Sequence, residues 1–283
     1  MRIIVLGGTG YLGSKVVMAL AERGHEILCI KREQSSLKRL EAVRGQIYFA
    51  DISDLGRSLD RKEPYDCLVN TACKYPRNAK DDFDIFEANF CVPLKILLEC
   101  LPHGIKKFVT VGTGLPHEFN AYSFAKNEFA RVCRWYGQQK SIGNLSQVCN
   151  IELENFYGAD EPKDRFIPAT VEKLKNNEKI LLTEGNQKRD FVYIDDVIRA
   201  ITVIVEKEDL PEYMDLPLGT GDGVPVREVI EYLKCITNSK SELCFGAIPK
   251  RTNEPDSIAD CTKMQECGID IQYNWQEGLK KLV

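Results

Sequence analysis

The sequence predicts an α/β fold of the doubly wound type, in which helices cover both faces of one parallel sheet. Two observations predict it. Short β-branched runs alternate with helical patterns through the first half of the chain, and the first run leads directly into a glycine-rich loop. Strands that alternate with helices are joined in parallel by right-handed crossovers, which place helices on both faces. This is the Rossmann architecture.

The expected elements follow one another through short connections. The expected strands are 2–6, 26–30, 46–50, 66–71, 107–111 and 145–151, and the expected helices are 11–22, 35–43, 83–100, 122–138, 167–176, 195–205 and 226–237. After about residue 152 the alternation loosens and prolines separate shorter elements. We therefore expect a Rossmann domain over residues 1–155 and a smaller C-terminal substrate-binding lobe over 156–283, with elements at about 187–205 returning to the main sheet.

Composition argues against several classes of protein. The chain of 283 residues is 43% hydrophobic, which suffices for one large domain with a smaller lobe. A net charge of -4 provides no basic field that would attract nucleic acid or an anionic membrane. No apolar run approaches the length of a membrane span, and the chain begins directly with a strand. We expect a cytoplasmic protein.

The cysteines and histidines suggest neither a disulfide scaffold nor a metal site. The eleven cysteines are scattered without a Cys-x-x-Cys pair, and the three histidines are far apart in the sequence. Seven cysteines lie in apolar runs and are expected to be buried as small hydrophobic side chains: Cys29, Cys67, Cys91, Cys100, Cys133, Cys149 and Cys235.

The glycine-rich loop after the first strand has the spacing of a dinucleotide-binding motif. It reads Gly7-Gly8-Thr9-Gly10-Tyr11-Leu12-Gly13, which is G-x-G-x-x-G from the second glycine or G-x-x-G-x-x-G from the first. In both registers the missing β-carbons let the backbone approach a pyrophosphate at the N-terminus of the following helix. The candidate cofactor contacts are Gly7, Thr9, Gly10, Tyr11, Leu12 and Gly13.

The end of the second strand bears on the choice of cofactor. An acidic residue there binds the ribose hydroxyls of NAD, whereas cations suit the 2'-phosphate of NADP. This chain has Lys31 and Arg32, with Glu33 as the rival acidic residue. A guanidinium at Arg32 can stack on adenine and pair with a phosphate through two hydrogen bonds. We therefore expect NADPH, with NAD as the less favoured alternative.

Three residues near the fifth strand predict carbonyl reduction. Tyr122 and Lys126 are four residues apart and share one face of a helix. Lys126 can bind the nicotinamide ribose and lower the pKa of Tyr122, so that the phenol protonates a carbonyl oxygen while the carbon receives a hydride. Thr113 follows the strand 107–111 and can hydrogen-bond the same oxygen. Doubly wound sheets bind their ligands at this carboxyl edge.

These motifs resemble those of the extended short-chain dehydrogenases/reductases that act on nucleotide sugars. Besides the glycine loop and the Tyr122/Lys126 pair, the resemblance is carried by Asp51-Ile52, Asn70-Thr71-Ala72, Asn155-Phe156-Tyr157-Gly158 and residues 189–197, and it spans almost the whole chain. It implies cofactor contacts at Asp51, Ile52, Thr71, Ala72, Cys73 and Asn89. It also implies that Asn155 contacts the sugar or diphosphate, that Phe166 and Ile167 lie near the base, and that Arg189 pairs with the diphosphate.

The C-terminal half resembles one branch of this family, the NADPH-dependent 4-reductases of CDP-4-keto-3,6-dideoxyglucose. The similar stretches are 154–158, 165–168, 219–224 and 245–254. Such enzymes form CDP-abequose or CDP-paratose for O-antigen and lipopolysaccharide biosynthesis. By contrast, Gly114 and Leu115 follow Thr113 where the family's dehydratases carry Asp-Glu, which argues against dehydration.

Several alternatives remain open at this point. An NAD-dependent nucleotide-sugar 4-epimerase would use the same three residues, and a non-catalytic dinucleotide-sensing module would keep only the fold. The base of the nucleotide and the configuration at C4 of the product are not specified by the sequence. The resemblance implies a homodimer paired through helices 83–100 and 122–138. Phe86, Phe90, Phe129 and Val132 can either line that interface or face the sheet.

Overall fold

The protein is described by a computed structural model over residues 1–59, 63–76, 81–139, 144–250 and 254–283. The chain divides into two compact units. The first comprises Met1–Thr113, Asn120–Glu152 and Ile198–Leu216, and the second comprises Gly114–Phe119, Leu153–Val197 and Pro217–Val283.

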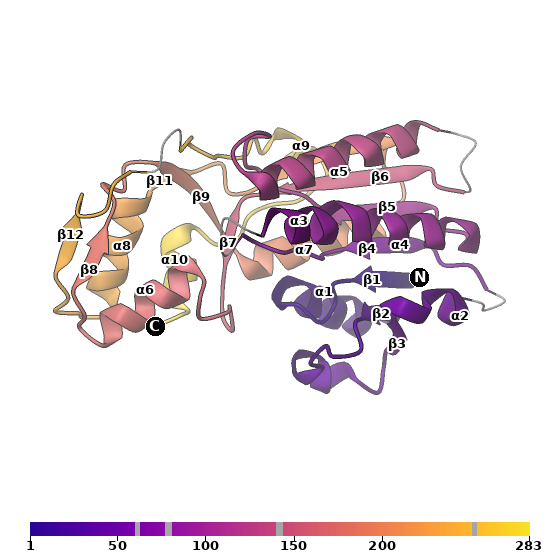
Figure 1. The fold of residues 1–283 in the computed structure, drawn as a ribbon, viewed down its shortest axis with the longest axis horizontal. Coiled ribbons are helices and arrows are strands. Elements are labelled where there is room, and N and C mark those ends of the chain that lie inside the picture. The colour runs from indigo at the N-terminus through magenta and orange to yellow at the C-terminus, as the bar shows by residue number, and fades with distance from the viewer. Residues whose placement is uncertain (60–62, 77–80, 140–143, 251–253) are drawn as a thin grey trace. The chain divides into compact units, whose positions relative to one another are not determined.

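A seven-stranded sheet dominates the first unit (Figure 1). Its strands lie in the order β10 (Tyr213–Leu218), β6 (Gln147–Leu153), β5 (Lys107–Val111), β4 (Cys67–Asn70), β1 (Arg2–Leu6), β2 (Glu26–Lys31) and β3 (Tyr48–Asp51). All pairings from β3 through β6 are parallel. The chain order reverses between β1 and β4, which is the position where doubly wound sheets hold their ligands. The predicted fold class is confirmed.

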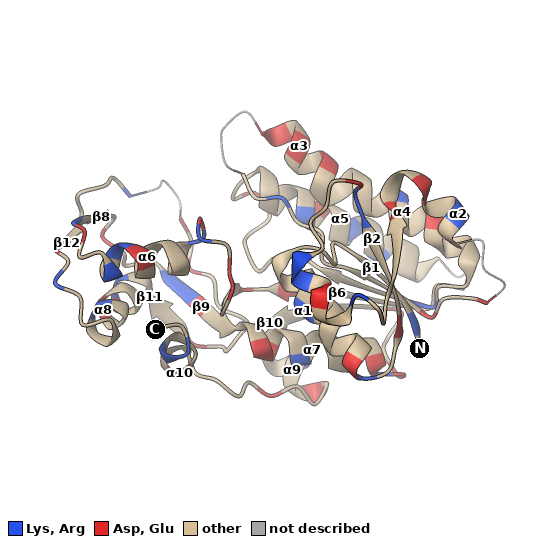
Figure 2. Cartoon of the chain, turned by 90° about the horizontal axis from the view of Figure 1, so that it is seen from below, with Lys and Arg blue, Asp and Glu red and all other residues tan. Residues whose placement is uncertain are grey.

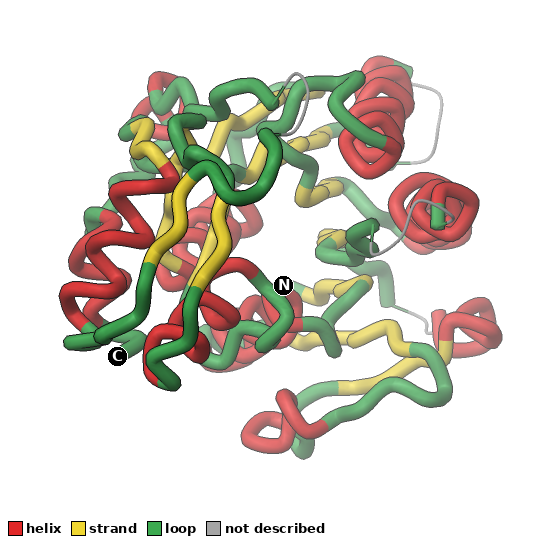
Figure 3. The backbone as a smooth tube through the Cα atoms, turned by 60° about the vertical axis from the view of Figure 1, so that its left-hand side comes forward, coloured by secondary structure: helices red, strands yellow, loops and turns green. Residues whose placement is uncertain are grey.

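Helices lie on both faces of this sheet (Figure 3). They are α1 (Tyr11–Glu22), α2 (Leu55–Leu59), α3 (Asp82–Phe86), α4 (Val92–Cys100), α5 (Ala121–Gln138) and α7 (Ile194–Glu206). On one face Leu28, Phe108 and Val148 pack in a core cluster with residues of α4 and α5. The alternate residues Val5 and Cys29 are equally buried on the other face. Burial on both faces explains why these strands read as continuous apolar runs.

Shorter elements build the second unit. A three-stranded sheet has the order β11 (Gly223–Pro225), β9 (Lys188–Tyr193), β7 (Asn155–Tyr157), and β8 (Ile180–Leu182) pairs in parallel with β12 (Leu243–Phe245). The helices are α6 (Phe166–Lys175), α8 (Val226–Ile236), α9 (Thr262–Glu266) and α10 (Trp275–Lys280). None of the helices in the described parts of the chain has the length and apolar character of a bilayer span.

The structure differs in detail from three expectations about local structure. The segment expected as a helix over 35–43 is a 3-10 helix, η1 (Lys38–Val43). The helix expected over 83–100 contains a π-helical turn, η3 (Glu87–Cys91), shortly before Pro93, which has no backbone N–H to donate. Cys91 and Cys235 are exposed rather than buried. Both lie in amphipathic helices, where an apolar neighbour in sequence belongs to a different face.

Candidate active site

The glycine loop is held against the end of β4. Gly7 has φ +82°, and a β-carbon there would lie 2.5 Å from the backbone nitrogen of Ala72. A β-carbon on Gly13 would lie 2.2 Å from the carbonyl oxygen of Gly7 and 2.5 Å from the hydroxyl of Thr71. Gly10 caps α1 without a side chain. The N–H groups of the first helical turn are therefore not capped by it, as binding of a pyrophosphate requires.

Charged groups gather at the ends of β2 and β3. The ammonium of Lys31 lies 3.8 Å from the carboxylate of Asp51, which also accepts hydrogen bonds from the hydroxyl and backbone N–H of Ser53. These two bonds from Ser53, with a smaller contribution from Lys31, hold the pKa of Asp51 below its usual value. Arg32 is exposed. Part of the positive charge of Lys31 is therefore offset by Asp51.

Arg39 is a basic residue near the loop that the sequence analysis did not single out. Its guanidinium lies over the ring of Tyr11, 5.5 Å from the ring centroid. A short 3-10 helix, rather than the expected longer helix, carries this side chain. In the sequence Arg39 is only one more basic residue in a charged segment, and nothing there distinguishes it. Contact with the glycine loop makes Arg39 a candidate for binding the cofactor.

The residues after β4 form a loop that is fixed by buried polar groups. The hydroxyl of Thr71 donates to the carbonyl of Leu6 at 3.0 Å. The amide of Asn89 donates to the carbonyls of Lys74 and Ile85 and accepts from the N–H of Lys74. Asn89 thus shapes the loop that contains Ala72 and the exposed Cys73. Direct contact of these residues with a cofactor stays a prediction, as does contact through Ile52.

Lys126 links the ends of two strands. Its buried ammonium donates to the carbonyl of Ala72 after β4, at 2.9 Å, and to the carbonyl of Val111 at the end of β5, at 2.8 Å. Burial lowers its pKa. The helix that carries it begins at a capping box formed by Asn120 and Ser123. Lys126 is thereby held at the carboxyl edge of the sheet, and Tyr122 and Thr113 are buried as well.

The electrostatic environment of Tyr122 differs from the expected one. Its pKa is raised well above the usual value, chiefly by burial and then by its neighbours Cys73 and Tyr75. The ammonium of Lys126 donates to two carbonyls, and its effect on the pKa of Tyr122 in a complex with cofactor stays a prediction. The ring of Tyr75 lies 4.8 Å from that of Tyr122. The sequence analysis did not single out Tyr75, because no spacing rule connects it to Tyr122.

Three of the five predicted substrate residues lie on or beside β9 in the second unit. Arg189 lies on this strand, which is partly blue in Figure 2. Asn155 on the parallel neighbour β7 is paired with Phe191 of β9. The exposed ring of Phe166 lies 6.4 Å from the ring of Phe191. Ile167, in contrast, is buried in the core, so only its backbone remains for a ligand.

The guanidinium of Arg189 is held by other groups of the same unit. It lies 2.6 Å from the carboxylate of Glu254 and donates to the carbonyls of Lys188 and Pro255. Glu254 ends the stretch 245–254 that carried part of the resemblance, of which residues 251–253 lie outside the described residues. A ligand phosphate that pairs with Arg189 therefore has to compete with Glu254.

Two aspartates of the 189–197 motif serve the fold. The buried carboxylate of Asp190 accepts from Thr220 through its N–H and hydroxyl, and from the N–H groups of Gly221 and Ala259. Asp196 accepts from the backbone of Gln272 and Tyr273. These bonds attach distant segments to β9 and α7, so this motif stabilises the unit in addition to presenting Arg189.

Comparisons with known proteins agree with this geometry. The model of the NAD dependent epimerase/dehydratase family matches residues 3–216. The CDP-abequose synthase of Salmonella muenchen is 27% identical over 100% of this chain and 97% of its own, and a putative UDP-glucose 4-epimerase of Methanocaldococcus jannaschii is 24% identical over 99% and 97%.

Solved structures show the same fold. The UDP-glucose 4-epimerase of Thermotoga maritima superimposes with a TM-score of 0.85 at 24% identity, covering 99% of this chain and 97% of that one. A UDP-glucuronic acid 4-epimerase mutant of Bacillus cereus, solved with NAD, gives 0.87 at 19% identity, again covering 99% and 97%. The family match covers well over half of the chain and confirms the resemblance seen in the motifs. This chain belongs to the NAD dependent epimerase/dehydratase family of extended short-chain dehydrogenases/reductases.

Proposed function

We propose that this chain is an NADPH-dependent reductase of the 4-keto group of a nucleotide-linked deoxysugar. The observation that carries the proposal is the placement of Tyr122 and Lys126 between the ends of β4 and β5, beside the reversal point of the sheet. The similarity to CDP-abequose synthases over the full length of the chain supports a reductase of a CDP-4-keto-3,6-dideoxyglucose type substrate. Such a product would enter O-antigen and lipopolysaccharide biosynthesis.

The residues of the first unit fit a dinucleotide. The uncapped start of α1 and the closely packed backbone of Gly7 and Gly13 would hold the pyrophosphate. Arg32 and Arg39 would bind the 2'-phosphate, and Asp51 the adenine amine. A bound NADPH would supply the hydride. Residues 1–155 form the proposed cofactor-binding domain. Of the segment around 187–205 that was expected to return to it, residues 198–205 belong to the first unit, whereas β9 belongs to the second.

The proposed chemistry is a proton transfer coordinated with hydride arrival. Tyr122 would donate its phenolic proton to the C4 oxygen as negative charge develops there. Thr113 would hold the same oxygen by a hydrogen bond. Lys126, fixed by two carbonyls, would orient the nicotinamide ribose. The fall in the pKa of Tyr122 that this requires would come with ligand binding, because a ribose hydroxyl and the ammonium of Lys126 would then stabilise the phenolate.

The second unit would bind the rest of the substrate. Within the proposed lobe 156–283, Arg189 would pair with the diphosphate and Phe166 would stack on the base. Asn155, just before the lobe, would contact the sugar or the diphosphate. The clustering of Asn155, Phe166 and Arg189 around β9 supports this assignment.

The second candidate function is an NAD-dependent nucleotide-sugar 4-epimerase. Its support is the similarity to UDP-glucose 4-epimerases, which also cover the chain nearly completely. Arg32 and Arg39 near the proposed 2'-phosphate position favour the reductase. A dinucleotide-sensing module is disfavoured because Tyr122 and Lys126 are both retained and buried together.

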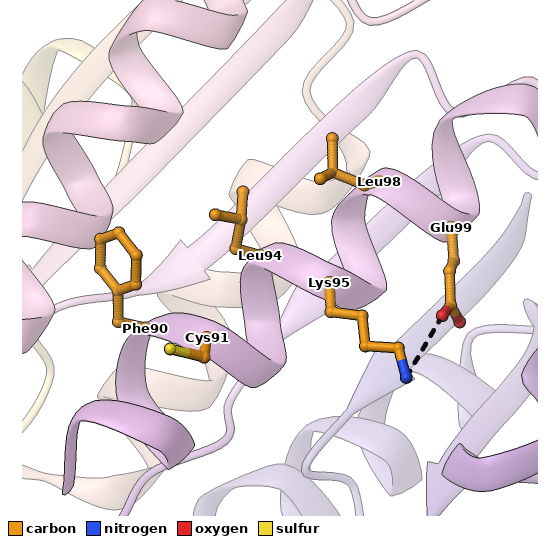
Figure 4. A pocket seen from close by; sticks show the side chains of 6 residues that line it. All are labelled: Phe90, Cys91, Leu94, Lys95, Leu98 and Glu99. Carbon is orange, nitrogen blue, oxygen red and sulfur yellow. Dashed lines mark ion pairs between the residues drawn. The ribbon is translucent and has the colours of Figure 1, made fainter. Parts of the chain in front are cut away.

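We further propose a cytoplasmic homodimer paired through α4 and α5. Leu98 on α4 and Phe124 and Trp135 on α5 are exposed apolar side chains. Figure 4 shows a pocket along η3 and α4, in which Lys95 and Glu99 lie beside apolar side chains such as Leu94 and Leu98. Lys95 and Glu99 form an ion pair at 3.7 Å within one copy. Of the four aromatic and apolar candidates, Phe129 instead packs on Phe108 in the core.

The proposal is tested by following NADPH oxidation with CDP-4-keto-3,6-dideoxyglucose. Wild type should turn over, and Tyr122→Phe should lose on the order of 10² to 10⁴ in rate because the general acid is gone. Tyr136→Phe removes a hydroxyl from the same helix and should be fully active. Absence of NADPH oxidation by wild type would remove the reductase, and undiminished turnover of Tyr122→Phe would remove the mechanism.

A further inference from the structure

Tyr122 is in contact with a second phenol that the chemistry above does not use. The rings of Tyr75 and Tyr122 lie 4.8 Å apart with their planes inclined by 35°. Tyr75 belongs to the loop after β4 whose Ala72 carbonyl accepts from Lys126. Tyr75 therefore contacts the proposed general acid directly.

The two phenols differ in their access to water. Tyr122 is 5% exposed, whereas Tyr75 is 39% exposed. A buried phenol that has given its proton to a substrate needs a route by which another proton returns. A hydroxyl can donate one hydrogen bond and accept others, so Tyr75 can connect Tyr122 with bulk solvent.

We propose that Tyr75 is a positioning residue that holds the hydroxyl of Tyr122 and returns a proton to it in each catalytic cycle. The inference rests on the proposed function. The carbonyl carbon receives the hydride of NADPH, and the carbonyl oxygen takes the phenolic proton of Tyr122. The Tyr122 phenolate then takes the proton of the Tyr75 hydroxyl, and the Tyr75 phenolate takes one from water or a buffer acid. Tyr75 does not touch the sugar in this scheme.

The burial of Tyr122 supports the direction of this transfer. Loss of water raises the pKa of Tyr122 well above its usual value, and the neighbouring Cys73 and Tyr75 raise it further. The buried phenolate is therefore unfavourable and a strong proton acceptor. A partly exposed phenol whose ring contacts Tyr122 is well placed to neutralise it.

Cys73 is the rival donor, because it is also a neighbour of Tyr122 that raises the pKa of the phenol. A thiol is a weaker hydrogen-bond donor than a hydroxyl. The Cys73 side chain also has no ring to stack on Tyr122, so it fixes the phenol less firmly. We therefore expect Cys73→Ala to reduce the rate less than the loss of the Tyr75 hydroxyl does.

The test compares Tyr75→Phe, Cys73→Ala and Tyr48→Phe with wild type. Tyr75→Phe keeps the ring and removes the hydroxyl, so kcat should fall roughly tenfold or more while KM for the nucleotide sugar and NADPH stay unchanged. Added imidazolium, a small proton donor, should restore kcat in this variant in proportion to its concentration and leave wild type unaffected. Tyr48→Phe removes the hydroxyl of another exposed tyrosine in the same unit and should behave as wild type.

The outcomes separate the two proposals. Wild-type kcat in Tyr75→Phe, or a loss that imidazolium does not restore, overturns the role of Tyr75 and leaves the reductase intact. A larger loss in Cys73→Ala than in Tyr75→Phe also overturns it. A wild type that oxidises no NADPH with any 4-keto nucleotide sugar removes the proposed function instead.

Discussion

The carboxylate of Glu254 lies 2.6 Å from the guanidinium of Arg189, and the two side chains are only 11% and 9% exposed. Breaking such a buried pair leaves a charge without compensation, which costs several kcal/mol unless another anion replaces the lost partner. Glu254 therefore both stabilises Arg189 in the free protein and competes with any phosphate that approaches it.

Glu254→Gln should lower stability but strengthen the binding of a nucleoside diphosphate. The amide no longer neutralises Arg189, so CDP should bind roughly tenfold more tightly, as measured by isothermal titration calorimetry. The matched control is Glu242→Gln, which removes a carboxylate from an exposed pair with Lys179 in the same unit and should leave the affinity unchanged. Equal or weaker CDP binding by Glu254→Gln would show that Arg189 does not receive the diphosphate.

Gly13→Ala should disrupt the cofactor loop. The added β-carbon meets the carbonyl of Gly7 at 2.2 Å and the hydroxyl of Thr71 at 2.5 Å, so the backbone has to shift. We expect a loss in the free energy of unfolding on the order of 1 to 3 kcal/mol, together with weaker dinucleotide binding. Gly56→Ala, in α2, meets no atom within 4 Å and should change stability by at most about 1 kcal/mol. Urea denaturation and NADPH titration measure both effects, and equal behaviour of the two variants contradicts the packing argument.

Arg32→Ala and Arg39→Ala should each weaken NADPH binding selectively. Each removes a charged partner of the proposed 2'-phosphate, so Kd for NADPH should rise on the order of tenfold while Kd for NADH stays nearly constant. Arg57→Ala serves as the control, because this side chain is exposed on α2. Fluorescence titration with both nucleotides provides the measurement. An equal rise in Kd for NADH would mean that the two arginines do not bind the 2'-phosphate.

Glu161 should make stability depend on pH. Its side chain is 3% exposed, its Oε2 atom has no hydrogen-bond partner among the described residues, and burial raises its pKa from 4.5 to about 7 against the opposing effect of Arg165. Between these two values the folded protein binds more protons than the unfolded chain. The contribution of Glu161 to stability therefore falls as pH rises through this window and is constant above about 7.

Glu161→Gln should remove this dependence. At about pH 8 the variant should be more stable than wild type by roughly 2–3 kcal/mol, and the difference should vanish near pH 4. Glu172→Gln, at a half-exposed carboxylate of α6, should show no such crossover. The free energy of unfolding in urea across the pH range gives the comparison. A constant difference between Glu161→Gln and wild type would place the pKa of Glu161 near its usual value.

The sequence predicted best what depends on local repetition. The runs that became β1, β2 and β5 are short, continuous and apolar, α1 follows with a helical pattern, and the glycine loop follows β1 directly. The four strands β7, β8, β11 and β12 have three residues each, too few for any period to be read. Contacts between residues that are distant in the chain could not be predicted from the sequence either. The contact of Tyr75 with Tyr122 and that of Glu254 with Arg189 form only because the fold brings these residues together.

The most direct test of whether this protein consumes NADPH as a reductant is to follow a labelled hydride into the product. The protein is incubated with a 4-keto nucleotide sugar and with NADPH that carries deuterium at the transferable position, and the product is analysed by NMR. The account predicts one deuterium at C4 of the sugar for each NADPH oxidised, and loss of this transfer in Tyr122→Phe. Tightly held NAD in the purified protein, with interconversion of 4-hydroxy sugars and no net oxidation of NADPH, would contradict it.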